Sequence, residues 1–331
     1  MKIKKIAVAA VIAIIVVGAL ALLLQGGNAP PQGNVIKIGY QASAPHALAF
    51  IAKEKGFFGQ EGLDAELVKF GSANLLMDAL AAGNIDAAGV VNFGVLFAMQ
   101  SASPGVFKVI GLRYYTDEAE WSIVARKNSG LKTLKDLEGK KLGVWPGANV
   151  RIVTNMVFEK TGVDANAVRT EQLAPELQLP ALESGSVDAL FTLEPYNILA
   201  VEKGLAYTLV RAPNSLLMKE YPIGGPVVST RLLENNPAAA SKFRKAIERA
   251  VDFYKNNREE SLEIVSKYVN IDESIRRKLS ARQEKTLDEL SQNDFESVQT
   301  LADAFLKQGA LKNRINASEM FLQAFARQTS R

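Results

Sequence analysis

The chain has 331 residues, of which 48% are apolar, so it is long enough to fold around more than one sizeable core. It has no cysteine and one histidine, which excludes disulfides, thiolate metal sites, cysteine nucleophiles and most histidine-centred catalysis. The net charge is +4, but three lysines among the first five residues supply +3, and residues 1–33 contain no acid, so the remainder carries 4 − 3 = +1. This balance predicts no nucleic-acid partner, which would need clustered basic residues.

The N-terminus predicts export. Residues 6–24 have no charged or polar side chain and follow the basic segment MKIKK. As a helix they would span roughly 28 Å, close to the hydrocarbon thickness of a bilayer. We expect either an uncleaved signal anchor or a cleaved signal peptide, followed by a flexible stalk over residues 25–34. The folded part would then be periplasmic or otherwise extracytoplasmic, and attached to the membrane only if residues 6–24 are retained.

The first half of the folded part alternates strands and helices. This order predicts an α/β fold with mainly parallel sheets flanked by helices. In chain order we expect a strand over Val35–Tyr40, a helix over His46–Lys55, a strand over Leu63–Phe70, a helix after Gly71–Asn74, a strand over Ala87–Val91 and a helix ending near Met99.

The second half repeats this alternation and then becomes helical. Asn236 before Pro237 predicts a capped helix with an apolar stripe, and beyond residue 237 only helical periods are found. The preceding elements are strands over Lys108–Arg113 and Ser122–Arg126, a short helix over Leu134–Leu137, a strand over Lys141–Val144, a helix over Arg151–Lys160, and strands over Ala189–Thr192 and Pro226–Ser229.

A thirteen-residue segment occurs twice, 102 positions apart. Leu75–Ala87 (LLMDALAAGNIDA) and Leu177–Ala189 (LQLPALESGSVDA) are identical at six positions, including Asp86 and Asp188. We interpret these two acids as turn residues before a strand. The repeat predicts two similar α/β units with a ligand cleft between them, joined by crossings near Ser122–Arg126 and Gly224–Val228.

Three loops rich in small residues are candidates for contacting a ligand. Each would lie at the carboxyl end of a strand and lead into a helix N-terminus, which favours anions. They are Gln41–Pro45, Gly71–Asn74 and Trp145–Asn149. Trp145 could form an aromatic wall, and Tyr114, Tyr115 and Trp121 could line the same cleft.

Polar residues at strand ends add further candidates. Asn92 follows one predicted strand and Glu194 follows another. Glu194 could bind a ligand amine or amide, close the two lobes through an arginine or lysine, or satisfy backbone donors at a helix start. No catalytic motif for a phosphate loop, a nucleophilic serine, a zinc helix or a dinucleotide site is present, so we predict no catalytic residue, no metal and no cofactor.

From about residue 35 to residue 237 the chain resembles substrate-binding proteins of ABC importers, of the nitrate/sulfonate/taurine type. The resemblance is carried by the order of six segments: IGYQ (38–41), KEKGFFGQEGLDAEL (53–67), ALAAGNIDAAG (79–89), LKTLKDLEGKKLGV (131–144), LAPELQLPALESGSVDAL (173–190) and EPY (194–196). It implies a two-lobed periplasmic-binding-protein fold of type II with C-terminal helices. The ligand-binding positions that it implies are Gln41, Ser43, His46, Ser72, Asn74, Asn92, Trp145, Gly147, Asn149, Glu194 and Tyr196.

The resemblance also implies domains and partners. We expect residues 35–124 and 226–331 to form lobe 1 and residues 125–225 to form lobe 2, after the 1–34 signal and stalk. The protein would be a monomer that captures a small molecule and delivers it to a membrane permease, with the ATPase subunit acting indirectly.

Three other functions remain as alternatives. A pyrimidine-precursor synthase of the same fold would resemble this chain but carries a cysteine-rich motif, and a transcription regulator would need an N-terminal DNA-binding helix pair. A transporter-independent exported sensor stays open. The ligand could be an oxyanion (sulfonate, nitrate or bicarbonate) or a heteroaromatic vitamin precursor. Leu193 stands where sulfonate binders commonly have an aromatic residue, and Glu194 favours a ligand with an amine or amide beside its anionic group.

Overall fold

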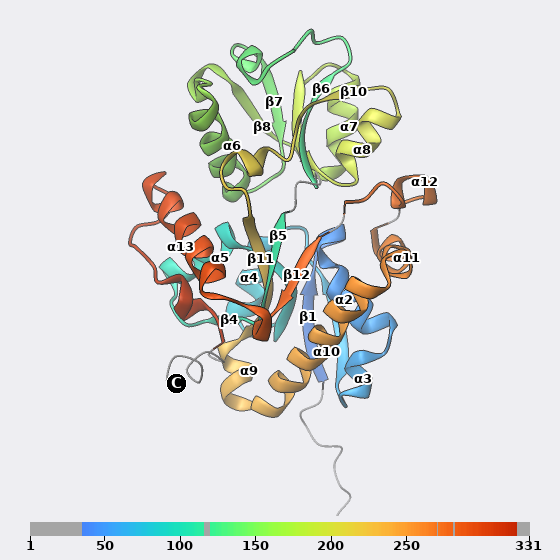
Figure 1. Ribbon diagram of the computed structural model, residues 1–331, viewed down its shortest axis with the longest axis vertical. Coiled ribbons are helices and arrows are strands. Elements are labelled where there is room, and N and C mark those ends of the chain that lie inside the picture. Colours follow the sequence, from blue (N-terminus) through green and yellow to red (C-terminus); the bar gives the residue numbers. More distant parts are fainter. Residues whose placement is uncertain (1–34, 116–119, 270, 281, 323–331) are drawn as a thin grey trace, which may run out of the picture.

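The chain folds around two separate β-sheets (Figure 1). In this computed structural model, residues 35–115, 120–269, 271–280 and 282–322 are described. Sheet A runs in the order β12 (Gln283–Thr286), β5 (Gly111–Tyr115), β11 (Tyr221–Ser229), β3 (Ala87–Asn92), β1 (Val35–Tyr40), β2 (Asp64–Lys69), with β4 (Phe107–Val109) paired to β11. Sheet B runs β10 (Ala206–Arg211), β6 (Trp121–Arg126), β9 (Ala189–Leu193), β7 (Lys141–Val144), β8 (Arg169–Gln172).

Each sheet has a parallel centre and antiparallel additions. The strand β1 pairs in parallel with β2 and β3, and the strand β7 pairs in parallel with β8 and β9. In contrast, β11 is antiparallel to β3, and β6 is antiparallel to β9. The predicted two-lobed α/β fold with mixed sheets is therefore confirmed, with sheet A in lobe 1 and sheet B in lobe 2. The sheets are not mainly parallel as expected, because six of the ten strand pairings among the described residues are antiparallel.

Helices cover the faces of both sheets (Figure 1). One buried apolar cluster lies between α2, α10 and α11, and another includes α5 and α13. The helices around sheet A are α2 (Ala47–Glu54), α3 (Phe57–Gln60), α4 (Ala73–Ala81), α5 (Phe93–Ala102), α9 (Thr230–Asn235), α10 (Pro237–Asn256), α11 (Arg258–Val269), α12 (Glu273–Arg276) and α13 (Gln292–Lys307). Those around sheet B are α6 (Ala148–Thr161), α7 (Pro175–Glu183) and α8 (Tyr196–Glu202).

The helix predicted after Asn236 forms as expected. The Asn236 side chain accepts a hydrogen bond from the backbone N–H of Ala239 at 3.0 Å, which caps α10. The predicted stripe along α10 is fully buried, so this helix is held in place by its apolar face. The stripe comprises Phe243, Ile247, Val251 and Tyr254.

The internal repeat has the same structural role in both lobes. Asp86 accepts a hydrogen bond from the backbone N–H of Lys37 at 2.9 Å, and Asp188 accepts the equivalent bond from Lys141 at 3.0 Å. Each carboxylate also meets an arginine, Arg231 at 2.9 Å for Asp86. The two acids therefore tie the turn after a helix to the start of the neighbouring strand, which confirms their interpretation as turn residues.

Replacing Asp86 with alanine is expected to lower the free energy of unfolding by about 2 kcal/mol, because the Lys37 N–H loses a charged acceptor. Chemical denaturation followed by circular dichroism measures this loss. Asp78→Ala, on the exposed side of α4, is the control and should change stability by less than about 0.5 kcal/mol. An equal effect of the two substitutions would contradict the structural role of the repeat.

Several sequence predictions need correction. The predicted lobe boundaries at 124/125 and 225/226 fall inside β6 and β11, yet β6 pairs only within sheet B and β11 only within sheet A. The chain instead crosses between β5 and β6 and again between β10 and β11. The expectation of helices alone after residue 237 is also wrong, because β12 returns to the edge of sheet A.

Other strands also differ from expectation. The predicted strand over 108–113 is divided into β4 and β5 at Ile110, and neither β8 nor β10 is predicted from the sequence. The predicted membrane segment, residues 6–24, lies outside the described residues. Among the residues that the structure describes, no helix is long and apolar enough to cross a membrane.

Candidate ligand-binding site

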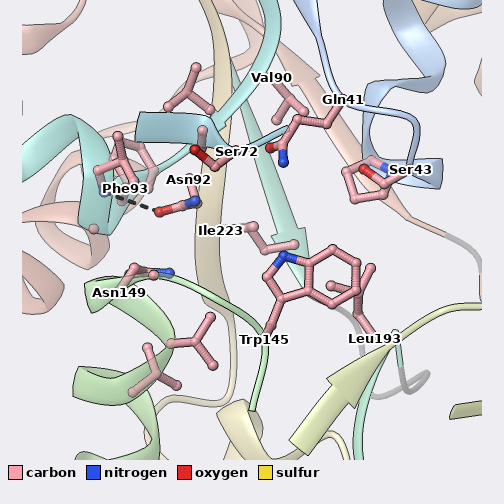
Figure 2. A pocket seen from close by; sticks show the side chains of 18 of the residues that line it. Gln41, Ser43, Ser72, Val90, Asn92, Phe93, Trp145, Asn149, Leu193 and Ile223 are labelled. Carbon is pink, nitrogen blue, oxygen red and sulfur yellow. Dashed lines mark hydrogen bonds between the residues drawn. The ribbon is translucent and has the colours of Figure 1, made fainter. Parts of the chain in front are cut away.

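A cavity of about 340 Å³ lies between the two lobes. Loops at the carboxyl ends of β1, β2 and β3 line it from lobe 1, and the segments after β7 and β8, together with the end of β9, line it from lobe 2. Figure 2 shows side chains from both lobes pointing into this space. Nine of the eleven predicted ligand-binding residues line it: Gln41, Ser43, His46, Ser72, Asn74, Asn92, Trp145, Gly147 and Asn149.

Two helix N-termini of lobe 1 open into the cavity. The Ser72 hydroxyl caps α4 by accepting from the N–H of Leu75 at 3.2 Å, and the Asn92 carbonyl oxygen caps α5 by accepting from the N–H of Val95 at 3.1 Å. Because each side chain uses an oxygen for its cap, the amide NH₂ of Asn92 is left to donate towards the cavity. The lobe 1 wall therefore offers donors and positive helix ends to a ligand.

An aromatic cluster forms the lobe 2 wall. Trp145 makes edge-to-face contacts with Trp121 and Tyr196, with ring centroids 6.5 Å and 5.7 Å apart, and Trp121 packs in the same way on Phe191. In Figure 2 the indole of Trp145 lies opposite Ile223 and below Gln41 and Ser72. The predicted aromatic wall is present, and Trp121 is part of it as expected.

The loop after β7 differs in one respect from the expected anion-binding loop. The N–H of Gly147 donates to the Gln172 side chain at 3.0 Å, so it is not directed at a ligand. Gly147 has φ of 125°, a conformation that a residue with a Cβ rarely adopts. Its role is to turn the chain so that Asn149 reaches the cavity.

Asn149 also brings the two lobes into contact. A Cβ added at Gly94, in the first turn of α5, would lie 1.7 Å from the Asn149 Oδ1 atom. The Asn149 carboxamide therefore rests directly on the backbone of lobe 1, and only glycine leaves room for it. Figure 2 shows Asn149, in the first turn of α6, below Asn92 and Phe93.

His46 lies in the wall as an uncharged imidazole. Its side chain is 2% exposed, and burial, followed by the nearby charge of Arg113, lowers its pKa to about 3. The Nδ1 atom has no hydrogen-bond partner among the described residues. A neutral ring presents one donor and one acceptor, so His46 can bind a polar group but cannot neutralise an anion.

The remaining two predicted residues lie elsewhere. Tyr196 packs behind Trp145 and faces a separate groove lined by α7 and α8. Glu194 is 2% exposed and accepts two backbone bonds of 3.0 Å from Ser280 N–H, with Arg282 at 3.8 Å. Glu194 therefore contacts lobe 1 rather than the cavity: its hydrogen bonds come from Ser280, and Arg282 is a more distant ion-pair neighbour.

Sequence reasoning missed several residues of the wall, namely Arg113, Phe191, Asn214, Tyr221, Ile223 and Leu301. Among the described residues that line the cavity, Arg113 is the one charged residue, and its charge is already compensated. It donates to both Glu120 oxygens at 3.0 and 3.1 Å and to the Pro45 carbonyl at 2.9 Å. An arginine inside an apolar strand was the available signal. Tyr114 does not line the cavity; its hydroxyl donates to Asp294 at 2.6 Å.

The cavity consequently combines amides, hydroxyls and aromatic rings, with no uncompensated charge among its described side chains. Within the described residues, no cluster of three or more histidine or acidic side chains could hold a metal. Two lobes that enclose such a cavity define a binding protein of the two-lobed periplasmic class.

The chain belongs to the NMT1/THI5-like family, whose pattern it matches over residues 43–261. A Bacillus subtilis (strain 168) protein with the provisional name aliphatic sulfonates-binding protein is 30% identical over 94% of this chain and 95% of its own length. The 4-amino-5-hydroxymethyl-2-methylpyrimidine phosphate synthase of Aspergillus parasiticus is 23% identical over 65% of this chain and 64% of its own.

Solved structures share the fold. The alkanesulfonate-binding protein of Xanthomonas axonopodis pv. citri bound to MOPS has a TM-score of 0.72 at 19% identity, covering 87% of this chain and 98% of that one. The periplasmic nitrate-binding protein of Synechocystis PCC 6803 has a TM-score of 0.70 at 19% identity, covering 87% and 84%. These findings confirm the resemblance to the nitrate/sulfonate/taurine type of substrate-binding protein.

Proposed function

We propose that this protein is the extracytoplasmic binding component of an ABC importer and captures one small molecule between its lobes. The observation that carries the proposal is the cavity itself, which loops of both lobes line in equivalent places. Its volume of about 340 Å³ suits a small molecule. The loaded monomer would dock on a membrane permease, while the ATPase subunit acts from the other side of the membrane.

The walls of the cavity favour a ligand with two parts. Trp145, Val90 and Leu193 supply apolar surface, whereas Gln41 and Asn92 supply amide groups. A sulfonate or heteroaromatic compound would place its apolar body on the first set and its polar or anionic head at the helix N-termini. Nitrate or bicarbonate would leave the apolar wall unused, so we rank them below the larger ligands.

Binding without catalysis is the reading that we propose over the enzyme alternative. The synthase is a more distant relative than the sulfonates-binding protein and covers less of the chain. This chain lacks cysteine entirely, and its single histidine is held neutral in the cavity wall. The absence of cysteine does not suit the cysteine-rich motif expected of such an enzyme.

A thermal-shift screen tests the proposed function. The panel would contain alkanesulfonates, a morpholine sulfonate, pyrimidines, nitrate and bicarbonate. A ligand present at one hundred times its Kd stabilises the folded state by about 2.7 kcal/mol, which raises Tm by several degrees. We expect a shift with a sulfonate or a heteroaromatic compound. A shift with nitrate alone would contradict the proposed ligand class, and turnover of a pyrimidine precursor would contradict the binding function.

A further inference from the structure

Five charged side chains are buried together where the two lobes join. Arg113 on β5 and Glu284 on β12 come from sheet A, and Arg282 immediately precedes β12. Glu120 immediately precedes β6, and Glu194 immediately follows β9, so both lie at the end of sheet B. Every one of these side chains is at most 3% exposed. We refer to the five as the interlobe charge cluster.

The contacts within the interlobe charge cluster are unequal. Arg113 and Glu120 form a two-bond pair at 3.0 and 3.1 Å. The other ion pairs are longer, with Arg113 Nε at 3.4 Å from Glu284, and Arg282 at 3.5 Å from Glu120 and 3.8 Å from Glu194. Distances beyond about 3.2 Å are too long for good N–H···O hydrogen bonds. Most of the cluster is therefore held by charge attraction rather than by directed bonds.

Several buried N–H donors of the interlobe charge cluster have no hydrogen-bond partner in the described part of the chain. The Nε, Nη1 and Nη2 atoms of Arg282 and the Nε atom of Arg113 have no hydrogen-bond partner among the described residues. Buried guanidinium donors are normally paired, and leaving one unpaired is costly. A cluster that leaves these donors without acceptors is not a set of saturated salt bridges.

The formal charges of the interlobe charge cluster do not balance. Two guanidinium groups face three carboxyl groups, which leaves one negative charge in excess if every carboxyl is ionised. An unpaired buried charge costs several kcal/mol, whereas a protonated carboxyl carries no charge and can donate a bond. One proton held by the cluster would make it neutral.

Among the described residues, no further cation lies inside the interlobe charge cluster; Lys255 acts on Glu284 only from outside it. From α10, the Tyr254 hydroxyl is buried near Arg282, and Lys255 pairs at the surface with Glu289 at 2.6 Å. From the loop after β1, His46 near Arg113 is neutral. Ser280 contributes only a hydroxyl and a backbone N–H, both donated to Glu194.

We propose that the interlobe charge cluster is a proton-binding site, in which one proton held by its three carboxyls neutralises the junction when the lobes are together. Glu120 and Glu194 from sheet B meet Arg113 and Arg282 from the sheet A side. Separating the lobes would expose these groups to water, where the carboxyls can ionise and release the proton. Lobe closure would therefore take up a proton. The inference rests on the proposed function only in that closure traps the ligand.

The direction of the pKa changes supports this site. Burial raises the pKa of Glu194 and of Glu284 from 4.5 to about 7, despite the opposing influence of the arginines. A carboxyl whose pKa is higher in the closed, folded state binds more protons there. Its contribution to stability is complete below pH 4.5 and is lost as pH rises through about 7. Closure should therefore weaken as the solution becomes alkaline.

Nuclear magnetic resonance of the full chain labelled with [δ-¹³C]glutamate tests the site directly, without any ligand. We expect carboxyl signals that titrate between pH 6 and 8, at least a full unit above the remaining glutamates. Glu194→Gln and Glu284→Gln should each remove one signal and move the other. The proposal is overturned if every glutamate titrates below about pH 5.5.

Small-angle scattering of the unliganded protein at pH 6 and pH 8 tests the coupling to closure. The radius of gyration should be larger at pH 8, and Glu194→Gln, which cannot ionise, should abolish the difference. Glu202→Gln is the matched control, because Glu202 also contacts the segment before β12, through Lys278, but is 46% exposed. Identical pH responses of the wild-type protein and Glu194→Gln would overturn the coupling. Failure of the ligand screen would leave both measurements interpretable.

Discussion

Replacing Arg282 with methionine is expected to lower the free energy of unfolding by about 3–5 kcal/mol at pH 8. Methionine retains much of the volume of the arginine stem but removes the guanidinium that lies between Glu120 and Glu194. The three carboxyls would then face Arg113 alone. Removing one partner of a buried charge cluster costs far more than the pair itself contributes, because the remaining charges stay desolvated.

The loss of unfolding free energy caused by Arg282→Met should be larger at high pH than at low pH. Without Arg282 the carboxyls bind protons more tightly, so the folded state holds more protons than the unfolded chain over a wider range of pH. Stability therefore falls as pH rises, and the deficit of the variant should be clearly smaller at pH 6 than at pH 8. Denaturant unfolding followed by tryptophan fluorescence at both values measures the two deficits.

An exposed arginine provides the matched control for this substitution. Arg314 pairs with Asp303 at 3.0 Å, but its side chain is 66% exposed. Arg314→Met should leave the unfolding curve unchanged, because solvent screens an exposed pair. If Arg282→Met were equally harmless at pH 8, the interlobe charge cluster would not stabilise the folded state through Arg282.

The residues that could be predicted from the sequence are those whose role is set locally. Ser72 and Asn92 stand between a strand and a helix, where their side chains cap the helix and face the cleft. Asp86 and Asp188 share one sequence context and make the same backbone bond. Each of these positions could be assigned from a few neighbouring residues.

The residues that could not be predicted depend on distant parts of the chain. Glu194 looks like a ligand residue in its own segment, but its partner Ser280 lies 86 positions away. The strand β12 reads QEKT, which has no apolar alternation, because its Glu284 is buried against Arg113 rather than against apolar side chains. A polar strand inside a charge cluster leaves no hydrophobic pattern for periodicity to detect.

The ligand cavity and the interlobe charge cluster share one residue, Arg113. Its guanidinium lines the cavity and holds the Pro45 carbonyl, next to His46, while its other bonds go to Glu120. A change in the arrangement of the lobes therefore alters the cavity wall and the interlobe charge cluster together. On the proposed proton binding, ligand binding and proton uptake would influence one another through Arg113.

The second large effect is expected from Gly94→Ala, which places a methyl group where the Asn149 side chain lies. Replacing Gly94 with alanine would put a Cβ 1.7 Å from Asn149 Oδ1 and 2.8 Å from the Phe305 ring. Overpacking of this kind raises the free energy of the closed state by about 1–3 kcal/mol, which lowers the equilibrium constant for lobe closure by roughly 5- to 150-fold. The affinity for a ligand found in the screen should fall by that factor, and the unliganded protein should show a larger radius of gyration.

A double substitution distinguishes a clash between the two lobes from a clash inside lobe 1. Asn149→Gly removes the side chain that meets the new methyl group but leaves the contact with Phe305, so Gly94→Ala with Asn149→Gly should restore the wild-type radius of gyration. Gly59→Ala, with nothing within 4 Å of the added Cβ, should leave the radius unchanged. If the double variant stays expanded, the strain lies between α5 and α13 within lobe 1. If it closes again, Asn149 is the point at which lobe 2 comes to rest on lobe 1, and glycine at position 94 is what lets the cavity shut.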